Sequence, residues 1–336
     1  MIFVTGIAGY IGSHTAVELL TQGYDVVGAD NFCNSSREAV DRIRELTGRD
    51  FSFYNIDVRD EGDLDEIFNA HKVDCVIHFA GLKAVGESVR IPIDYYTNNL
   101  NSTIALCSCM QKHGVKKIIF SSSATVYSSD DDMPLTEESA VGNCASPYGW
   151  TKLMCEQILR DTASANREWA VSLLRYFNPI GAHESGRIGE NPKGVPNNLM
   201  PYITMVAVGR LPVLRVFGND YETADGTGMR DYIHVVDLAK GHVEAIRYLE
   251  NRTGTHVFNL GTGRGTTVLE LVNAFEKVTG QKVPMEMTAR REGDLPICFS
   301  SVVKAERLLY WTADMSIEQA CEDAWRWQSQ NPDGYR

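Results

Sequence analysis

The chain has 336 residues, of which 43% are hydrophobic and 23% are charged, and its formal net charge is −12. This length exceeds what one compact core normally holds, so two lobes around a cleft are expected. The acidic balance argues against a nucleic-acid partner, because a phosphate backbone favours a basic surface. It leaves open an anionic small ligand, since a few arginines can make one pocket locally positive.

No apolar run approaches the length of a membrane span, and Met1 leads directly into an apolar segment without a basic region before it. We therefore expect a cytoplasmic protein that does not associate with membranes. The eight cysteines form no CxxC pair and have no nearby histidine spacing, and the eight histidines form no HExxH motif. This pattern predicts reduced thiols and no metal site.

Short apolar runs alternate with helical stretches in the first half of the chain. Such alternation is typical of βαβ units and of a parallel sheet buried on both faces. A helix is expected over 13–22, and proline-rich residues 179–228 read as mostly loop. The sequence predicts strands over 2–5, 25–29, 51–55, 75–79, 117–121, 171–176 and 256–260.

A glycine-rich turn follows the first predicted strand, with Gly6, Gly9 and Gly12 opening the first helix. Glycines at this spacing let the backbone approach a pyrophosphate, whose charge is met by the helix N-terminus. Asp30 ends the second strand, where an acidic side chain accepts from ribose hydroxyls and favours NAD over NADP. The alternative is that Asp30 only caps a turn. Asp57, at the end of the third strand, is a weaker candidate for a contact with the adenine edge of the cofactor.

Tyr148 and Lys152 lie four residues apart behind Pro147, which can open a helix, so both side chains share one helical face. Ser123 follows an apolar strand whose end should point into the same cleft. A tyrosine base active near neutrality needs a pKa lowered by about three units, or roughly 4 kcal/mol. An adjacent lysine ammonium and a positive nicotinamide ring can together stabilise the phenolate by that amount. Alone, the spacing also fits a packed tyrosine beside a solvated lysine.

Longer motifs extend these signals over nearly the whole chain. They include Gly-Tyr-Ile-Gly-Ser-His at 9–14, His-Phe-Ala-Gly-Leu-Lys-Ala-Val-Gly-Glu-Ser at 78–88, Phe-Ser-Ser-Ser-Ala-Thr-Val-Tyr at 120–127, Arg-Tyr-Phe-Asn-Pro at 175–179, Pro-Asn-Asn-Leu-Met-Pro-Tyr at 196–202, Arg-Asp-Tyr-Ile-His-Val at 230–235 and Arg-Arg-Glu-Gly-Asp at 290–294. With these motifs the chain resembles the extended short-chain dehydrogenase/reductase superfamily and, within it, the UDP-glucose 4-epimerase family.

The resemblance implies an α/β protein with a Rossmann-type doubly wound parallel sheet and a smaller α/β substrate-binding domain. It assigns 1–178 and about 230–262 to the NAD-binding domain, and about 179–229 and 263–336 to the UDP-sugar-binding domain. It also suggests a homodimer formed through a helix bundle, and a role in galactose metabolism.

The implied reaction interconverts UDP-glucose and UDP-galactose through a 4-keto sugar, with Tyr148 removing the 4-hydroxyl proton, Lys152 beside it and Ser123 sharing the hydrogen-bond network. The expected NAD contacts come from both ends of the domain: Gly6, Gly9, Tyr10, Ile11, Gly12, Asp30, Asn31, Asn34, Ser35, Asp57, Val58, Phe79, Ala80, Lys83, Asn98, Tyr148, Lys152 and Tyr176.

For the UDP-sugar, the arginines can bind a diphosphate through paired donors, and an aromatic ring can stack on uracil. The resemblance places around the substrate Lys83, Ser123, Tyr148, Asn178, Asn198, Leu199, Phe217, Arg230, Tyr232, Arg291, Asp294 and Cys298. The chain departs from the family pattern at Ser128, Trp150 and Ser301, none of which removes a group that the chemistry needs.

Cys298 stands where the family has either a tyrosine or a small residue, at the border of the sugar 2-position. A small residue leaves room for an N-acetyl group, because a close-packed wall does not otherwise yield that volume. We therefore expect activity on UDP-N-acetylglucosamine and UDP-N-acetylgalactosamine as well. The alternative is a cysteine that serves packing only, since pocket size is permissive.

Two other functions compete with this interpretation. A sugar-nucleotide 4,6-dehydratase or decarboxylase begins with the same oxidation, but a dehydratase needs an acid/base pair where this chain has Ser123-Ala124-Thr125. A non-catalytic NAD-binding sensor has no need to keep Tyr148, Lys152 and a strand-end serine together.

Overall fold

The computed structural model describes residues 1–128, 131–194, 196–291 and 294–335. Its centre is a seven-stranded sheet in the order β11-β6-β5-β4-β1-β2-β3, in which every neighbouring pair is parallel. The strands span β1 Ile2–Thr5, β2 Val26–Ala29, β3 Ser52–Tyr54, β4 Cys75–His78, β5 Lys117–Ser123, β6 Ala170–Tyr176 and β11 Gly254–Leu260. The predicted α/β class with a Rossmann-type doubly wound sheet is confirmed.

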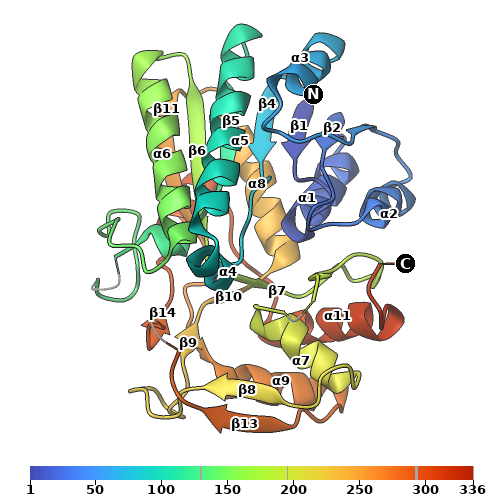
Figure 1. The fold of residues 1–336 in the computed structure, drawn as a ribbon, viewed down its shortest axis with the longest axis vertical. Coiled ribbons are helices and arrows are strands. Elements are labelled where there is room, and N and C mark those ends of the chain that lie inside the picture. Colours follow the sequence, from blue (N-terminus) through green and yellow to red (C-terminus); the bar gives the residue numbers. More distant parts are fainter. Residues whose placement is uncertain (129–130, 195, 292–293, 336) are drawn as a thin grey trace.

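Helices cover both faces of the sheet, which explains why its strands are apolar on both sides (Figure 1). One layer contains α1 Tyr10–Thr21, α2 Arg37–Thr47 and α8 Val235–Leu249, and the other contains α3 Glu61–Ala70, α5 Pro92–Lys112 and α6 Pro147–Ala165. The short α4 Val85–Arg90 and the 3-10 turn η1 Ala124–Val126 lie near the lower end of the sheet, where parallel strands leave their carboxyl ends.

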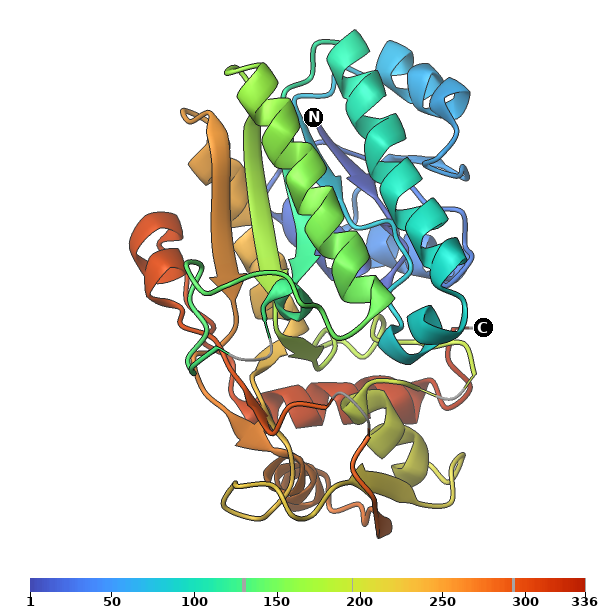
Figure 2. The same cartoon turned by 60° about the vertical axis from the view of Figure 1, so that its left-hand side comes forward.

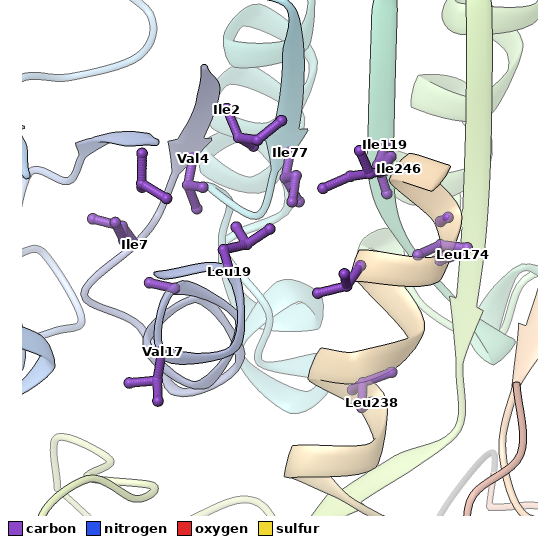
Figure 3. Packing of buried hydrophobic residues seen from close by; sticks show 14 of the residues in the cluster. Ile2, Val4, Ile7, Val17, Leu19, Ile77, Ile119, Leu174, Leu238 and Ile246 are labelled. Carbon is purple, nitrogen blue, oxygen red and sulfur yellow. The ribbon is translucent and has the colours of Figure 1, made fainter. Parts of the chain in front are cut away.

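Apolar side chains from the strands meet those of the helices in a continuous core. Figure 3 shows Val4 and Ile77 from the sheet facing Leu19 of α1, while Ile119 lies near Ile246 of α8. Burying one such side chain fully stabilises the fold by about 1.5–3 kcal/mol. This packing fixes the strand ends, and with them any site built on those ends.

A smaller body lies beyond the carboxyl ends of the sheet (Figures 1 and 2). Its own apolar cluster joins residues from three helices and three strands. Its elements are α7 Leu199–Ala207, β8 Leu214–Phe217 paired with β13 Met285–Thr288, the sheet of β12 Thr266–Thr267, β9 Met229–Arg230 and β14 Ile297–Cys298, and the helices α9 Val268–Thr279 and α11 Ile317–Gln330.

The chain crosses between the two bodies several times. β7 Asn178–Ile180 pairs in parallel with β10 Tyr232–His234 at the junction. α10 Val303–Leu309 returns to the larger body, where its Ala305 and Leu309 join the core beside α8. The assignment of these bodies to NAD and to a UDP-sugar stays a prediction.

The predicted strands match the observed ones within one or two residues. The first helix begins at Tyr10 rather than at Ser13, because Gly9 is its N-cap and the glycine-rich turn ends there. The described residues of 179–228 also include the helix α7 and the strand β8. The helix tolerates Pro201 because the first turn needs no internal N–H donors.

Candidate active site

The glycine-rich turn lies at the carboxyl end of β1 and requires its glycines on steric grounds. A Cβ at Gly12 would lie 2.2 Å from the Gly6 carbonyl oxygen, and Gly6 itself has a φ of +71°. No side chain caps the N-terminus of α1. The first amides of α1 and the positive end of its helix dipole can therefore bind an anion such as a pyrophosphate.

Asp30 lies at the end of β2 beside this turn and is 7% exposed. Its Oδ2 accepts from the Ala8 amide at 3.0 Å, and its Oδ1 accepts from the Phe32 amide at 2.9 Å and from Ser35 Oγ at 2.6 Å. Asp30 thus holds the glycine turn and the following loop together, and its carboxylate oxygens keep lone pairs for a ribose hydroxyl.

Other residues expected at the NAD site surround the same strand ends. Asn31 donates to Asp57 at 3.3 Å, and hydrogen bonds from Arg59 lower the pKa of Asp57 to about 2. Asn34 is exposed, and the Val58 side chain is buried in the core. Ile11 packs against the core beneath the turn.

The strand β4 is followed by Phe79 and Ala80, which line the opposite side of the glycine turn. A Cβ at Gly6 would lie 2.8 Å from the Ala80 amide nitrogen, so these two segments are in close contact. Phe79 packs on the His242 ring, to which the Tyr176 hydroxyl also hydrogen-bonds. Burial raises the pKa of Tyr176.

Asn98 donates to the Asn99 side chain at 3.1 Å. Asn99, which was not expected at the site, donates to Thr151 Oγ1 of α6 at 2.9 Å and accepts from the Leu82 amide at 2.8 Å. This contact fixes the loop that carries Lys83 against the helix that carries Tyr148.

The three expected catalytic side chains converge at the carboxyl end of β5. α6 begins at Pro147, as the sequence predicted, and the structure adds that Ser146 caps it. Lys152 is 6% exposed and donates to the Ser121 carbonyl at 2.6 Å, with Nζ 6.0 Å from the Tyr148 ring centroid. Ser123 ends β5, and its hydroxyl accepts from the Thr125 amide at 3.2 Å and from Thr125 Oγ1 at 3.0 Å.

The electrostatics of this group differ from the simple expectation of a lowered tyrosine pKa. Burial raises the pKa of Tyr148 to about 12, and only the hydrogen bond from Ser123 acts against this. Burial also lowers the pKa of Lys152 to about 8. Without a bound cofactor, burial therefore favours the neutral phenol, because desolvation disfavours both the Tyr148 phenolate and the Lys152 ammonium.

A buried ion pair lies one turn after Lys152 and was missed from the sequence. Glu156 accepts from Arg175 Nη2 at 2.7 Å and Nε at 2.9 Å, and from Ser122 Oγ at 2.6 Å. These contacts tie α6 to β5 and β6. The arginine lies next to a motif tyrosine in the sequence, but nothing local indicates its partner.

Four of the expected substrate residues form one charged cluster in the smaller body. Asp294 accepts from Arg230 at 3.4 Å and from Arg291 at 3.0 Å, and the Arg291 guanidinium lies 4.6 Å from the Phe217 ring centroid. Two arginines beside one aromatic ring suit a nucleoside diphosphate. Glu292, in the same motif, lies outside the described residues.

Tyr232 and Cys298 lie close to this cluster. Burial raises the pKa of Tyr232 to about 12. Cys298 is paired in register with Arg230 across β14 and β9, and its side chain packs against the small cluster of Tyr127, Leu135 and Phe177. The cysteine therefore belongs to a wall that reaches toward the end of β5. An open pocket of about 300 Å³ lies just beyond Phe217 and is lined by residues 218–220, which follow β8, and by residues 287–290 at the end of β13.

Lys83 and Asn198, expected on the cofactor and substrate sides, share one carboxylate. Glu190 Oε1 accepts from Lys83 Nζ at 3.0 Å and from Asn198 Nδ2 at 2.7 Å. Asn198 is the N-cap of α7, so Leu199 begins that helix. Asn178 is exposed at the start of β7. Glu190 carries no sequence signal that would have indicated this role.

Within the described ranges, no helix is long and apolar enough to cross a membrane. In the same part of the chain, no group of three or more histidine, cysteine, aspartate or glutamate side chains is arranged to hold a metal ion.

Comparison with known proteins agrees with this geometry. Residues 2–261 match the model of the NAD dependent epimerase/dehydratase family. The chain is 59% identical over 335 residues to UDP-glucose 4-epimerase of Bacillus subtilis, covering 100% of this chain and 98% of that protein. It is 53% identical to UDP-glucose 4-epimerase of Homo sapiens, covering 99% and 98%.

Solved structures give the same result. The UDP-glucose 4-epimerase of Bifidobacterium longum, in complex with NAD+ and UDP, superposes with a TM-score of 0.96 at 52% identity and covers 99% of both chains. The chain therefore belongs to the NAD dependent epimerase/dehydratase family, among its UDP-glucose 4-epimerases.

Proposed function

We propose that this protein interconverts UDP-glucose and UDP-galactose by inverting the sugar at C4, with NAD held at the glycine-rich turn. The observation that carries the proposal is the convergence of Tyr148, Ser123 and Lys152 at the end of β5. The names of full-length relatives and the NAD+ and UDP in the Bifidobacterium longum complex support it.

The fit to NAD rests on the uncapped N-terminus of α1 and on the glycine-rich turn, where there is no room for a Cβ at Gly6 or Gly12. In this proposal the amides at Tyr10 and Ile11 receive the pyrophosphate, while Asp30 accepts from the adenosine ribose. When bound, NAD+ takes a hydride from the sugar C4 and returns it.

The chain's own residues supply the proton chemistry. Tyr148 takes the proton of the 4-hydroxyl through its phenolic oxygen and returns it after the 4-keto sugar has turned its other face. Because burial raises the pKa of Tyr148 to about 12, the charge of Lys152 and that of the oxidised nicotinamide ring are both needed to reach the phenolate. Ser123 holds the phenol and the sugar oxygen in one hydrogen-bond network.

The nucleotide is held by the cluster in the smaller body. Arg230 and Arg291 bind the diphosphate in place of their bonds to Asp294, and Phe217 stacks on uracil once Arg291 turns toward the phosphates. Asp294 then accepts from a ribose hydroxyl. The anchored diphosphate leaves the sugar free to rotate.

We also propose that N-acetylated UDP-sugars are substrates. Cys298 is a small residue in the wall built with Leu135 and Phe177. A tyrosine there would add about six heavy atoms to a packed surface, which has no spare volume to absorb them. The cysteine leaves that volume to an N-acetyl group.

The protein is further proposed to be a homodimer. α5 and α6 expose apolar side chains to solvent, with Ile93 72%, Ile104 46% and Met154 39% exposed. Large apolar residues on neighbouring helices are typical of a protein–protein interface. Sedimentation of the purified protein tests this, and a monomer at micromolar concentration overturns it.

Turnover of UDP-galactose and of UDP-N-acetylgalactosamine, followed separately by NMR, tests the function. Formation of UDP-glucose from the first, with no net change in NAD, is the expected result. Formation of a 4-keto-6-deoxy sugar would instead identify a dehydratase. No product at all from a protein that retains NAD would favour a sensor.

A further inference from the structure

Asp231 lies between two residues of the proposed nucleotide site, Arg230 and Tyr232, and its side chain is fully buried. Its Oδ1 accepts from the amide and the hydroxyl of Thr262, at 2.8 and 2.7 Å. Its Oδ2 accepts from the Gly263 amide at 3.1 Å and from the amide and hydroxyl of Ser300, at 3.1 and 2.6 Å. The carboxylate thus joins three separate segments.

The main chain of Asp231 makes a second set of contacts. Its amide donates to the Cys298 carbonyl at 3.1 Å, and its carbonyl accepts from the Asn178 amide at 2.9 Å. Both partners were expected at the substrate site. Asp231 therefore holds two substrate-side strands with its backbone and their supporting loops with its side chain.

Gly261 provides independent support for this arrangement. A Cβ at this position would lie 2.3 Å from Ser300 Oγ and 2.5 Å from Asp231 Oδ2. A side chain here would displace the carboxylate from its donors. The glycine keeps the space in which the hydrogen bonds to Asp231 form.

Ser300 connects the carboxylate to the wall that contains Cys298. The neighbouring Phe299 carbonyl accepts from the Leu135 amide at 2.9 Å, and the Ser301 amide donates to the Leu135 carbonyl at 2.7 Å. Leu135 and Cys298 belong to the same packed cluster. A change at Asp231 is thereby transmitted to the wall beside the end of β5.

We propose that Asp231 is a positioning residue that fixes the Cys298 wall and Arg230 relative to the catalytic group. The effect of Asp231 on catalysis rests on the proposed UDP-sugar 4-epimerase function. Its effect on the Cys298 wall can be tested without turnover. A buried carboxylate is stable only when its lone pairs are filled, and here donors from two other segments, Thr262 with Gly263 and Ser300, fill them.

The test replaces Asp231 with Asn, which is equal in size but turns an NH2 group toward donors. Iodoacetamide labelling of the NAD-loaded protein, resolved by peptide mass spectrometry, reports how often the wall opens. We expect Cys298 to label at least about tenfold faster than in the unmodified protein, the factor that one lost charge-assisted hydrogen bond produces in a local opening equilibrium.

Other cysteines of the same molecule separate local from global change. Exposed Cys33 should label at an unchanged rate, and buried Cys107 should stay protected. Asp237→Asn is the matched variant, because Asp237 is also buried and accepts from the Met315 amide at 2.7 Å, away from the wall. It should leave Cys298 labelling unchanged. In turnover, Asp231→Asn should raise KM for UDP-galactose several-fold with less effect on kcat.

Equal labelling of Cys298 in Asp231→Asn and in the unmodified protein would overturn the proposal, as would simultaneous exposure of Cys107. If Asp231→Asn does not fold, Ser300→Ala keeps the carboxylate and removes only the two hydrogen bonds of the Ser300 hydroxyl, the one to Asp231 and the one from the Gly263 amide. It must still accelerate Cys298 labelling without affecting Cys107. Absence of UDP-galactose turnover in the unmodified protein would refute the proposed function and leave the labelling result to decide the role of Asp231.

Discussion

The ammonium of Lys152 donates to the main-chain carbonyl of Ser121 at 2.6 Å, which joins α6 to the end of the central strand β5. This bond sets the distance between the lysine and the phenol of Tyr148, one turn earlier on the same helix. It also points the lysine charge at the strand end, where Ser123 lies. The geometry leads to predictions for the catalytic group, the cofactor site, the sugar wall and the stability of the fold.

Tyr148→Phe removes the proposed base while keeping its ring. Turnover of UDP-galactose should fall by about 10²–10⁴-fold, the usual contribution of a positioned acid–base group. NAD retention, measured by absorbance after denaturation, should not change. The matched variant is Tyr310→Phe, whose side chain is 90% exposed and which should keep full turnover. Appreciable activity in Tyr148→Phe would refute the assignment.

Lys152→Met removes the positive charge beside the phenol. Burial raises the pKa of Tyr148 to about 12, so without this ammonium the phenolate becomes rarer at neutral pH. The remaining turnover should be low at pH 7 and should rise with pH up to at least pH 9. Rates measured over pH 6–9 test this, with Lys116→Met as the surface control, since Lys116 pairs with Glu168. Parallel pH profiles for the two proteins would contradict the role.

Gly12→Ala places a Cβ 2.2 Å from the Gly6 carbonyl oxygen. The glycine turn must then move away from the helix N-terminus, and bound NAD should be lost or reduced to a small fraction. Gly86→Ala is the control, because a Cβ at Gly86 meets no atom within 4 Å. Full NAD content in purified Gly12→Ala would show that the turn does not hold the pyrophosphate.

Cys298→Tyr fills the space in front of the Cys298 wall, where the proposed N-acetyl group would lie. Turnover of UDP-N-acetylgalactosamine should fall by more than about tenfold relative to that of UDP-galactose, since steric pocket contacts discriminate by roughly 10–200-fold. Cys298→Ala keeps the space and should retain both activities. The two substrates are followed by NMR in parallel. An unchanged ratio in the tyrosine variant would remove Cys298 from the specificity argument.

Three buried histidines should make the fold sensitive to mild acid. Burial lowers the pKa of His14 and of His78 to about 3 and that of His242 to about 4. The unfolded chain binds these protons near pH 6.5 and the folded chain does not, so their contribution to stability is present above pH 6.5 and is lost as the pH falls below it.

The slope can approach about 4 kcal/mol per pH unit when all three protons are taken up on unfolding, at about 1.4 kcal/mol per proton. Urea denaturation between pH 5 and pH 8 measures it. His242→Gln removes one of the three groups, so its stability should depend less steeply on pH below 6.5. A stability that does not change between pH 7 and pH 5 would contradict the prediction.

The amino-acid sequence alone determined the parallel sheet, the glycine turn and the spacing of Tyr148 and Lys152. Each of these depends on local patterns: buried strands read as apolar runs, a phosphate turn needs glycine, and a helix brings positions four apart onto one face. The first helix began three residues earlier than predicted because Gly9 itself is the cap.

Only the tertiary structure decided which distant side chains act on these motifs. Lys83 meets Glu190 across 107 positions, and Asp231 meets Ser300 across 69. Burial of Tyr148 between these segments raises its pKa, where the sequence had led us to expect a lowered one. Hydrogen bonds and desolvation depend on how separate segments pack, and no spacing within one segment specifies that packing.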